Sequence, residues 1–327
     1  MKSLRSVMAA ACAVVGIGLV SGPAAAQAPA YPSKSIRFVV AYPPGGGNDL
    51  FARSTAPRLS ELLGQPVVVE NRPGANGQIA GQLVARAEPD GHTIMVEQSS
   101  IATNVLLYRK PLFDVRKDLT PIVFAANLDN AILVRSNSGL QTFEEFLAFA
   151  RGNPGKLAYG SSGHGSSQHL AMELLAREAG LTLHHVPFKG TPEIISALLA
   201  GDVQAFLISA ATATRYTKDG RLRVIATTGT ERSSLLPEVP TVSQSGFPNY
   251  SYYTWLAMFT TAGTAPPVVE QLRGAFDRIL KDPGIRKQFE VQGWVIKGDG
   301  PDSVRKLIDD DIRRYGQIIT ELNIRID

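Results

Sequence analysis

The chain has 327 residues, 44% of them hydrophobic and 19% charged, which is the composition of a globular protein with a full core. Its formal net charge is +4, and Lys and Arg are scattered among Asp and Glu, so no nucleic acid partner is expected. Cys12 is the only cysteine, which excludes an intrachain disulfide.

Residues 1–26 have the pattern of a cleavable signal peptide. Lys2 and Arg5 form a basic start, an apolar stretch runs from Val7 to Val20, and the small residues Ala24–Ala26 precede the expected cleavage point. The apolar stretch is shorter than the roughly 20 residues that a membrane-spanning helix needs. We expect cleavage after Ala26 and a soluble mature chain in the periplasm, without a thiol or a lipid anchor.

Short β-branched runs alternate with helical patterns along the rest of the chain, the order typical of an α/β fold. Strands are predicted at Ile36–Ala41, Pro66–Glu70, Thr93–Val96, Ile122–Ala125, Ala131–Val134, Leu157–Tyr159, His184–Val186, Ala205–Ile208 and Arg223–Thr227. Helices are predicted at Leu50–Leu63, Gln78–Ala87, Phe143–Arg151, Gln168–Glu178, Glu193–Leu199, Val268–Leu280 and Ser303–Glu321. The aromatic stretch Tyr250–Trp255 is read as a further strand with one packed face.

The first predicted strand runs into a glycine-rich turn, Pro43–Asp49, which opens a helix. Backbone N–H groups at a helix N-terminus can bind a carboxylate or phosphate without a cationic side chain. The candidate ligand-binding residues of this turn are Pro44, Gly45, Gly46, Gly47 and Asn48. Asp49 is interpreted as a helix cap and Arg53 as its structural partner, because a carboxylate in the turn would repel an anion.

A second loop, residues 161–167, also lies between a predicted strand and a helix. Ligands of open parallel sheets bind beyond the carboxyl ends of the strands, so two such helix starts facing each other would grip both ends of a dicarboxylate. Further candidates follow other strands, and capping of a helix is the alternative for each serine. These candidates are Ser99, Thr103, Ser161, Gly165, Ser166, Ser167 and Ser209.

Several motifs occur in a family-like order from about Tyr31 to the C-terminus. They are Pro43–Asp49 with Ala52 and Arg53, Val68–Gly77, Pro89–Thr93, Ser161–Ser166 with His169 and Leu170, His185–Gly190, and Pro240–Val242. The ordered set resembles the periplasmic solute-binding receptors of tripartite tricarboxylate transporters, the Bug family.

The resemblance implies an α/β, two-lobed periplasmic-binding-protein fold of the flytrap-like type II, each lobe a mostly parallel sheet flanked by helices. Lobe 1 is expected at 27–130 plus 241–327 and lobe 2 at 131–240. The two loops would act as pincers on a carboxylate, partly through ordered waters. The expected function is capture of a small organic anion, a carboxylate or dicarboxylate, and delivery to the large and small integral membrane subunits of the transporter. The receptor is expected to be a monomer.

One departure from the family pattern bears on specificity. Relatives commonly carry an Asp after the Phe near the end of a second-lobe strand, whereas this chain has Phe206 followed by Leu207. Because Leu207 cannot bind an ammonium group, we expect a simple organic acid as the ligand in preference to an amino acid.

Other functions remain open alternatives: a ligand-loaded signalling receptor, a binder of a neutral amide or heterocycle, or a hydrolase. Residues 163–167 miss the Gly-x-Ser-x-Gly pattern, and no third group is evident to orient His169 as a base for Ser166. His164 and His169 are five residues apart, which is off the spacing of paired zinc ligands on a helix. The histidines are therefore interpreted as structural, and no catalytic residue, metal site or cofactor is expected.

Overall fold

The computed structural model describes residues 31–326, so the expected signal peptide lies outside the described residues. Within 31–326 the strands are β1 (Ile36–Val40), β2 (Val67–Asn71), β3 (Thr93–Gln98), β4 (Leu119–Arg135), β5 (Ala158–Ser161), β6 (His184–Pro187), β7 (Ala205–Ser209), β8 (Leu222–Thr227), β9 (Tyr253–Thr261) and β10 (Trp294–Asp299). The helices are α1 (Gly47–Leu63), α2 (Gln78–Ala85), α3 (Ser100–Leu107), α4 (Val115–Asp118), α5 (Phe143–Gly152), α6 (Ser167–Ala179), α7 (Thr191–Ala200), α8 (Ala210–Tyr216), α9 (Pro266–Lys281), α10 (Pro283–Glu290) and α11 (Pro301–Glu321), with a 3₁₀ turn η1 (Ala75–Gly77).

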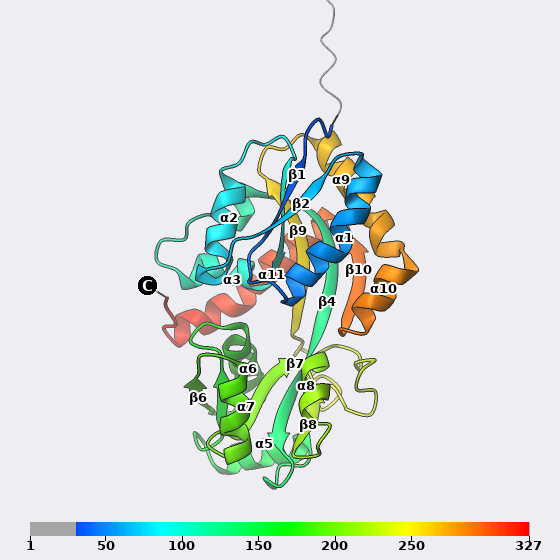
Figure 1. Ribbon diagram of the computed structural model, residues 1–327. Coiled ribbons are helices and arrows are strands. Elements are labelled where there is room, and N and C mark those ends of the chain that lie inside the picture. The colour runs from blue at the N-terminus through cyan, green and yellow to red at the C-terminus, as the bar shows by residue number, and fades with distance from the viewer. Residues whose placement is uncertain (1–30, 327) are drawn as a thin grey trace, which may run out of the picture.

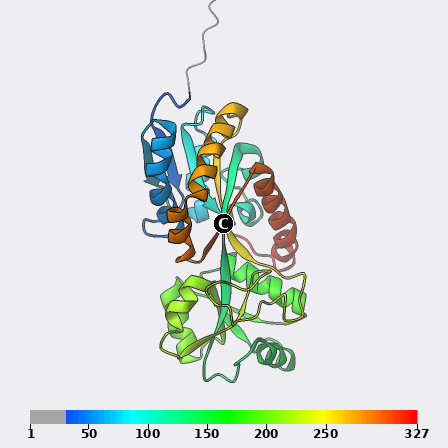
Figure 2. The ribbon, with the colours of Figure 1, turned by 90° about the vertical axis from the view of Figure 1, so that its right-hand side faces the viewer.

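The molecule has two lobes joined through β4, which runs from one into the other (Figures 1 and 2). The first half of β4 pairs with β9 and β10, and its second half, from Asn130, pairs with β7 and β8. The main path of the sheet is β2-β1-β3-β9-β4-β7-β5-β6. We call the part built on β1–β3, β9, β10 and the first half of β4 the first lobe. The part built on β5–β8 and the second half of β4 is the second lobe.

Parallel and antiparallel pairing are separated in this sheet. The outer strands of each lobe are parallel, β2-β1-β3 in the first and β6-β5-β7 in the second. The strands around β4 are antiparallel, because the chain returns along β9 and β10 beside it. The carboxyl ends of β1 and β7 point toward the junction of the lobes, which is where the expected binding loops lie (Figure 1).

Helices cover both faces of each lobe, and the buried clusters follow this layering. In the first lobe α1, α9 and α10 contribute Phe51, Phe276 and Phe289 to one face, while α2, α3 and α11 cover the other (Figure 2). In the second lobe α5 and α6 lie on one face and α7 and α8 on the other. The last turns of α11 pack with α6 of the second lobe through Tyr315 and Ile318.

The two strands predicted at Ile122–Ala125 and Ala131–Val134 are one strand of 17 residues. The intervening residues 126–130, Ala-Asn-Leu-Asp-Asn, have weak strand propensity. Cross-strand pairing overrides that propensity, because Asn127 lies opposite Trp255 and Asp129 opposite Tyr253. The sequence patterns did not predict β10 or the short helices α3, α4, α8 and α10. The lobe boundaries at 130/131 and 240/241 stay predictions.

No helix among residues 31–326 is long and apolar enough to span a lipid bilayer.

Candidate ligand-binding site

The start of α1 is an uncapped helix N-terminus at the edge of the first lobe that faces the second (Figure 1). Its N-cap is Gly46, and no side chain hydrogen-bonds to this cap. Pro43, Pro44, Gly45 and Gly46 are exposed, so solvent or a ligand can reach this turn. Proline has no N–H and the Gly45 N–H donates to Asp49, so the candidate donors are the N–H groups from Gly46 onward. The first N–H groups of a helix have no partners within the helix, which makes the turn suited to an anion.

Two of the glycines in this turn have a structural reason. Gly45 adopts φ +86°, a backbone conformation that favours glycine. A Cβ on Gly47 would lie 3.1 Å from Cζ2 of Trp294, so the backbone approaches the indole ring closely. α1 therefore begins at Gly47, three residues earlier than predicted.

Asp49 stabilises the turn through hydrogen bonds and does not act as a ligand-binding group. Its Oδ2 accepts a hydrogen bond of 2.8 Å from the Gly45 N–H, and its Oδ1 accepts from Nδ2 of Asn71 at 2.8 Å and Nε of Arg53 at 3.0 Å. Burial alone would raise the pKa of Asp49, but these hydrogen bonds outweigh it and lower the pKa below its usual value. The predicted pairing with Arg53 is confirmed, whereas the N-cap is Gly46 and not Asp49.

Asn48 is the one candidate of the first turn with an unused polar side chain. It is 4% exposed, and its Nδ2 has no hydrogen-bond partner among the described residues. A buried amide N–H without a partner costs free energy, which a ligand oxygen or a water molecule would recover.

The start of α6, in contrast, is capped by its own loop. The Ser166 hydroxyl accepts a hydrogen bond from the His169 N–H, so Ser166 is an ordinary N-cap. Gly165 is buried with φ +71°, and Ser161 is fully buried. The hydrogen bonds of these three candidates lie within the second lobe, and their contact with a ligand stays a prediction.

A serine–histidine pair is present in this loop, between Ser161 Oγ and His185 Nε2 at 2.6 Å. The same hydroxyl donates to the Gly163 carbonyl and accepts from the Gly163 N–H, at 3.0 and 3.1 Å. A fully buried hydroxyl with these partners fixes the loop and cannot reach a substrate as a nucleophile.

Three candidates from both lobes meet in one small cavity. Ser99 and Thr103 of the first lobe and Ser167 of the second line a cavity of about 10 Å³, which has room for about one water molecule. Tyr252 lies between them. Burial raises its pKa, and side-chain hydrogen bonds to Ser167, Thr254 and Ser99 oppose that rise. Tyr252 was not predicted as a site residue, because the aromatic stretch Tyr250–Trp255 has the pattern of a strand with one packed face.

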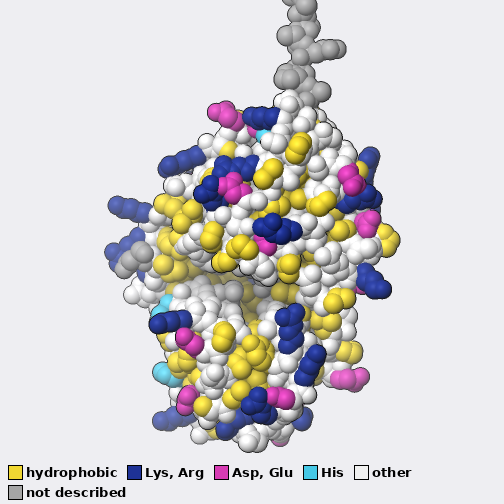
Figure 3. Space-filling view, in the orientation of Figure 1, with side chains coloured by type: hydrophobic (Ala, Val, Ile, Leu, Met, Phe, Trp, Pro, Cys, Tyr) yellow, Lys and Arg dark blue, Asp and Glu magenta, His cyan; other side chains and the backbone are white. Residues whose placement is uncertain are grey.

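The remaining candidates lie elsewhere. Ser209 caps α8 by accepting a hydrogen bond from the Thr212 N–H. Leu207, which we expected near the ligand at the end of a second-lobe strand, lies inside β7 with its side chain buried in the core. The specificity argument drawn from Leu207 is therefore wrong in its geometry, because a side chain there faces the interior and not a ligand. Figure 3 shows the surface hollowed between the lobes, with largely uncharged side chains and backbone along the hollow.

Most of this chain matches one family of known proteins. The model of the tripartite tricarboxylate transporter family receptor matches residues 51–324. A UPF0065 protein from the tcbD–tcbE intergenic region of Pseudomonas sp. strain P51 is 34% identical over 296 residues, covering 90% of this chain and 88% of the relative. A UPF0065 protein from the gbd 5′ region of Cupriavidus necator is 37% identical over 284 residues, covering 85% and 84%.

Solved structures of this family are also similar to this chain. A TctC solute-binding protein from Polaromonas, without ligand, has a TM-score of 0.78 and 29% identity, covering 89% of this chain and 99% of that one. Rpa4515 of R. palustris with adipate has a TM-score of 0.75 and 28% identity, covering 89% and 97%. MatC of Rhodopseudomonas palustris with bound malate has a TM-score of 0.73 and 27% identity, covering 88% and 100%. The chain therefore belongs to the tripartite tricarboxylate transporter receptor family, whose members are periplasmic solute-binding proteins and not enzymes.

Proposed function

We propose that this protein captures a small organic anion with at least one carboxylate between its lobes and delivers it to a tripartite membrane transporter. The observation that carries the proposal is the uncapped, exposed start of α1, built by Gly45, Gly46 and Gly47. Two structural relatives hold dicarboxylates, adipate and malate, which favours the same ligand class here.

The physics of the α1 start suits a carboxylate. A helix N-terminus carries about half a positive charge, and an anion there gains roughly 0.3 to 2 kcal/mol beyond its hydrogen bonds. The unpartnered Nδ2 of Asn48 adds one more donor at the same turn. In this proposal the hydroxyl groups of Ser99, Ser167 and Tyr252 receive the other end of the ligand, through water or directly, when the lobes close.

Calorimetric titration with succinate, malate, adipate, their monoamides, aspartate and nicotinamide tests this assignment. The decisive variant is Gly46→Asp, which adds a carboxylate at the N-cap where the ligand carboxylate would bind. The backbone at Gly46 is extended, and a Cβ there meets only Pro43 O at 3.6 Å, so we expect the fold to be kept. The matched control is Gly300→Asp, the same change at the glycine N-cap of α11.

We expect at least one acid to bind the wild type, Gly46→Asp to lose most of that affinity, and Gly300→Asp to keep it. Equal affinity in wild type and Gly46→Asp would contradict the role of the α1 start. If nicotinamide or a fully amidated analogue binds and no acid does, the assigned ligand class would change from an organic anion to a neutral molecule.

Export, the membrane partners and the monomeric state belong to the same proposal. Mass spectrometry of the exported protein should give a chain that begins at Gln27. Co-purification from membranes that contain one large and one small transporter subunit, but not from membranes that contain only a sensor protein, would support transport over signalling. Light scattering should give the mass of one mature chain.

A further inference from the structure

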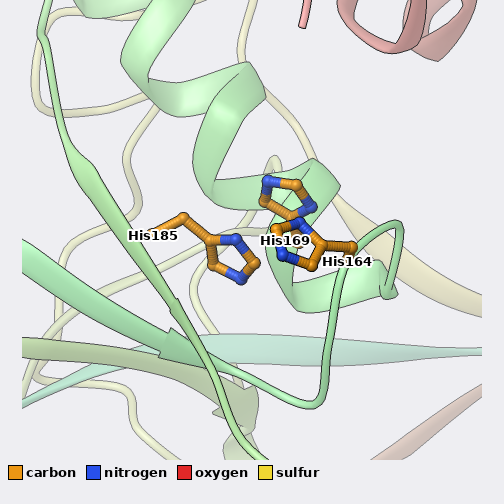
Figure 4. Close-up of side chains that lie close together, drawn as sticks. All are labelled: His164, His169 and His185. Carbon is orange, nitrogen blue, oxygen red and sulfur yellow. The ribbon is translucent and has the colours of Figure 1, made fainter. Parts of the chain in front are cut away.

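Three histidines from separate segments converge in the second lobe (Figure 4). His164 lies in the loop before α6, His169 in the first turn of α6, and His185 on β6. One ligand nitrogen from each ring lies within 4.8 Å of those of the other two. The rings of His169 and His185 are stacked with centroids 3.8 Å apart, and the His164 ring stands nearly perpendicular to both.

Three imidazole groups are a donor set that binds zinc and related ions. The ring binds these ions in its neutral form.

Hydrogen bonds orient two of the rings. Ser161 Oγ lies 2.6 Å from Nε2 of His185, which leaves Nδ1 as the free nitrogen of that ring. A hydrogen bond of this kind, from outside the ligand set, fixes ring orientation in metal sites. On His169 the Gly165 N–H instead donates to Nδ1 at 3.0 Å, so this hydrogen bond must break before Nδ1 can bind an ion.

An open pocket gives access to the cluster. The pocket has a volume of about 420 Å³ and is lined by the three histidines, by Glu173 one turn along α6, and by residues 322–325 after α11. A metal ion can enter through it, and a fourth coordination position can face solvent there.

We propose that His164, His169 and His185 bind one divalent transition-metal ion of the zinc type, with water in the fourth position. Tetrahedral Zn²⁺ with bonds of 2.0–2.1 Å places its nitrogen ligands about 3.4 Å apart, so the three nitrogens must move inward by about 1 Å. The stack of His169 and His185 must open, and His169 must exchange the Gly165 N–H for the ion. His164 can follow, because it is exposed between Gly163 and Gly165, which adopt φ +120° and +71°.

The test uses untagged protein, stripped with a chelator and titrated with ZnCl₂ by calorimetry at neutral pH. We expect one equivalent of Zn²⁺ and a rise in melting temperature. His185→Ala and His169→Gln should each weaken binding tenfold or more. His184→Ala is the matched control, because His184 is adjacent on β6, exposed, and on the opposite face of the strand.

Co²⁺ gives a readout on the wild-type protein that does not depend on the folding of any variant. A four-coordinate site should give the intense visible absorption of tetrahedral Co²⁺, which excess Zn²⁺ removes. Three outcomes would each overturn the proposal. They are the absence of saturable Zn²⁺ uptake, the weak spectrum of octahedral Co²⁺, and a loss of Zn²⁺ affinity in His184→Ala equal to that in His185→Ala. Titration of organic acids in the presence of chelator keeps this result separate from the proposed carboxylate site.

Discussion

Gly165 of the second lobe packs directly against Leu107 of the first, so closely that a Cβ on Gly165 would lie 2.9 Å from Cδ2 of Leu107. Gly165 also adopts φ +71°, and Ile326 approaches the same position at 3.4 Å. The loop before α6 therefore forms part of the contact between the lobes. Glycine is required there by both backbone conformation and space.

Gly165→Ala should lower the free energy of unfolding by about 1–3 kcal/mol, because alanine pays for the left-handed backbone and collides with Leu107. Urea unfolding monitored by circular dichroism measures the change. Gly152→Ala is the control, since a Cβ there meets nothing within 4 Å. Equal free energies of unfolding for the two variants would show that the loop around Gly165 accommodates alanine without loss of stability.

Asp49→Asn should destabilise the protein by about 1.5–3 kcal/mol at neutral pH, because the hydrogen bonds to the Asp49 carboxylate are charge-assisted. The native pKa of Asp49 is lowered, so its contribution is present above pH 4 and is lost as pH falls through the native pKa. The difference between wild type and variant in urea unfolding should shrink below pH 4.

Asp277→Asn is the control for this comparison. Its partner Lys281 is one helical turn away on the surface, and exposed pairs of this kind contribute at most about 1 kcal/mol. If Asp277→Asn lowers the free energy of unfolding as much as Asp49→Asn does, the result would count against the special role of Asp49.

Glu97 should make the protein less stable as pH rises. Burial raises its pKa to about 8, and its Oε2 has no hydrogen-bond partner among the described residues. Between the pKa of an unfolded glutamate and pH 8, the unfolded chain loses this proton and the native state keeps it. The free energy of unfolding therefore falls over that range, by up to about 5 kcal/mol.

Glu97→Gln should remove most of this decline in a series of urea unfolding curves from pH 5 to pH 8. Burial also raises the pKa of Asp311 to about 6 and lowers the pKa of His169 and His185. These groups change stability below about pH 7, so the Glu97 contribution is read as the difference between wild type and variant. Glu70→Gln is the control, because hydrogen bonds from Arg37 lower the pKa of Glu70 and its effect lies at acidic pH. A difference between wild type and Glu97→Gln that does not change from pH 5 to pH 8 would refute the prediction.

Tyr252→Phe should weaken ligand binding severalfold, because the hydroxyl that reaches Ser99 and Ser167 is lost from the cavity between the lobes. The free energy of unfolding should fall by about 1–3 kcal/mol, because the hydroxyl has the three hydrogen-bond partners Ser167, Thr254 and Ser99. Tyr250→Phe is the matched control, since that hydroxyl is buried and donates to the Ala171 carbonyl at 3.3 Å, away from the cavity. Calorimetry should show reduced affinity only for Tyr252→Phe.

Features with local signals were predictable from the sequence. The glycines before α1, the serine before α6 and the pairing of Asp49 with Arg53 depend on residues within one or two turns of each other, and the structure contains all three. Such signals operate over a few residues, so the sequence displays them directly.

Features that depend on distant partners were not predictable. Asn127 is strand because β9 lies beside it, and Tyr252 becomes a site residue because Ser99 and Ser167 meet at its hydroxyl. His185 joins His169 only through the folding of β6 against α6, so spacing along the chain could not reveal the cluster.

Because β4 runs unbroken through both lobes, the alternation of its side chains links the packing of one lobe to that of the other. Side chains alternate between the faces of a strand, so inserting or deleting one residue near Asn130 would invert every later β4 side chain relative to its neighbours. The buried Ile132 and Val134 would then point toward the opposite helix layer. The number of residues in β4 is therefore fixed by the packing of both lobes, whereas a surface loop tolerates insertions.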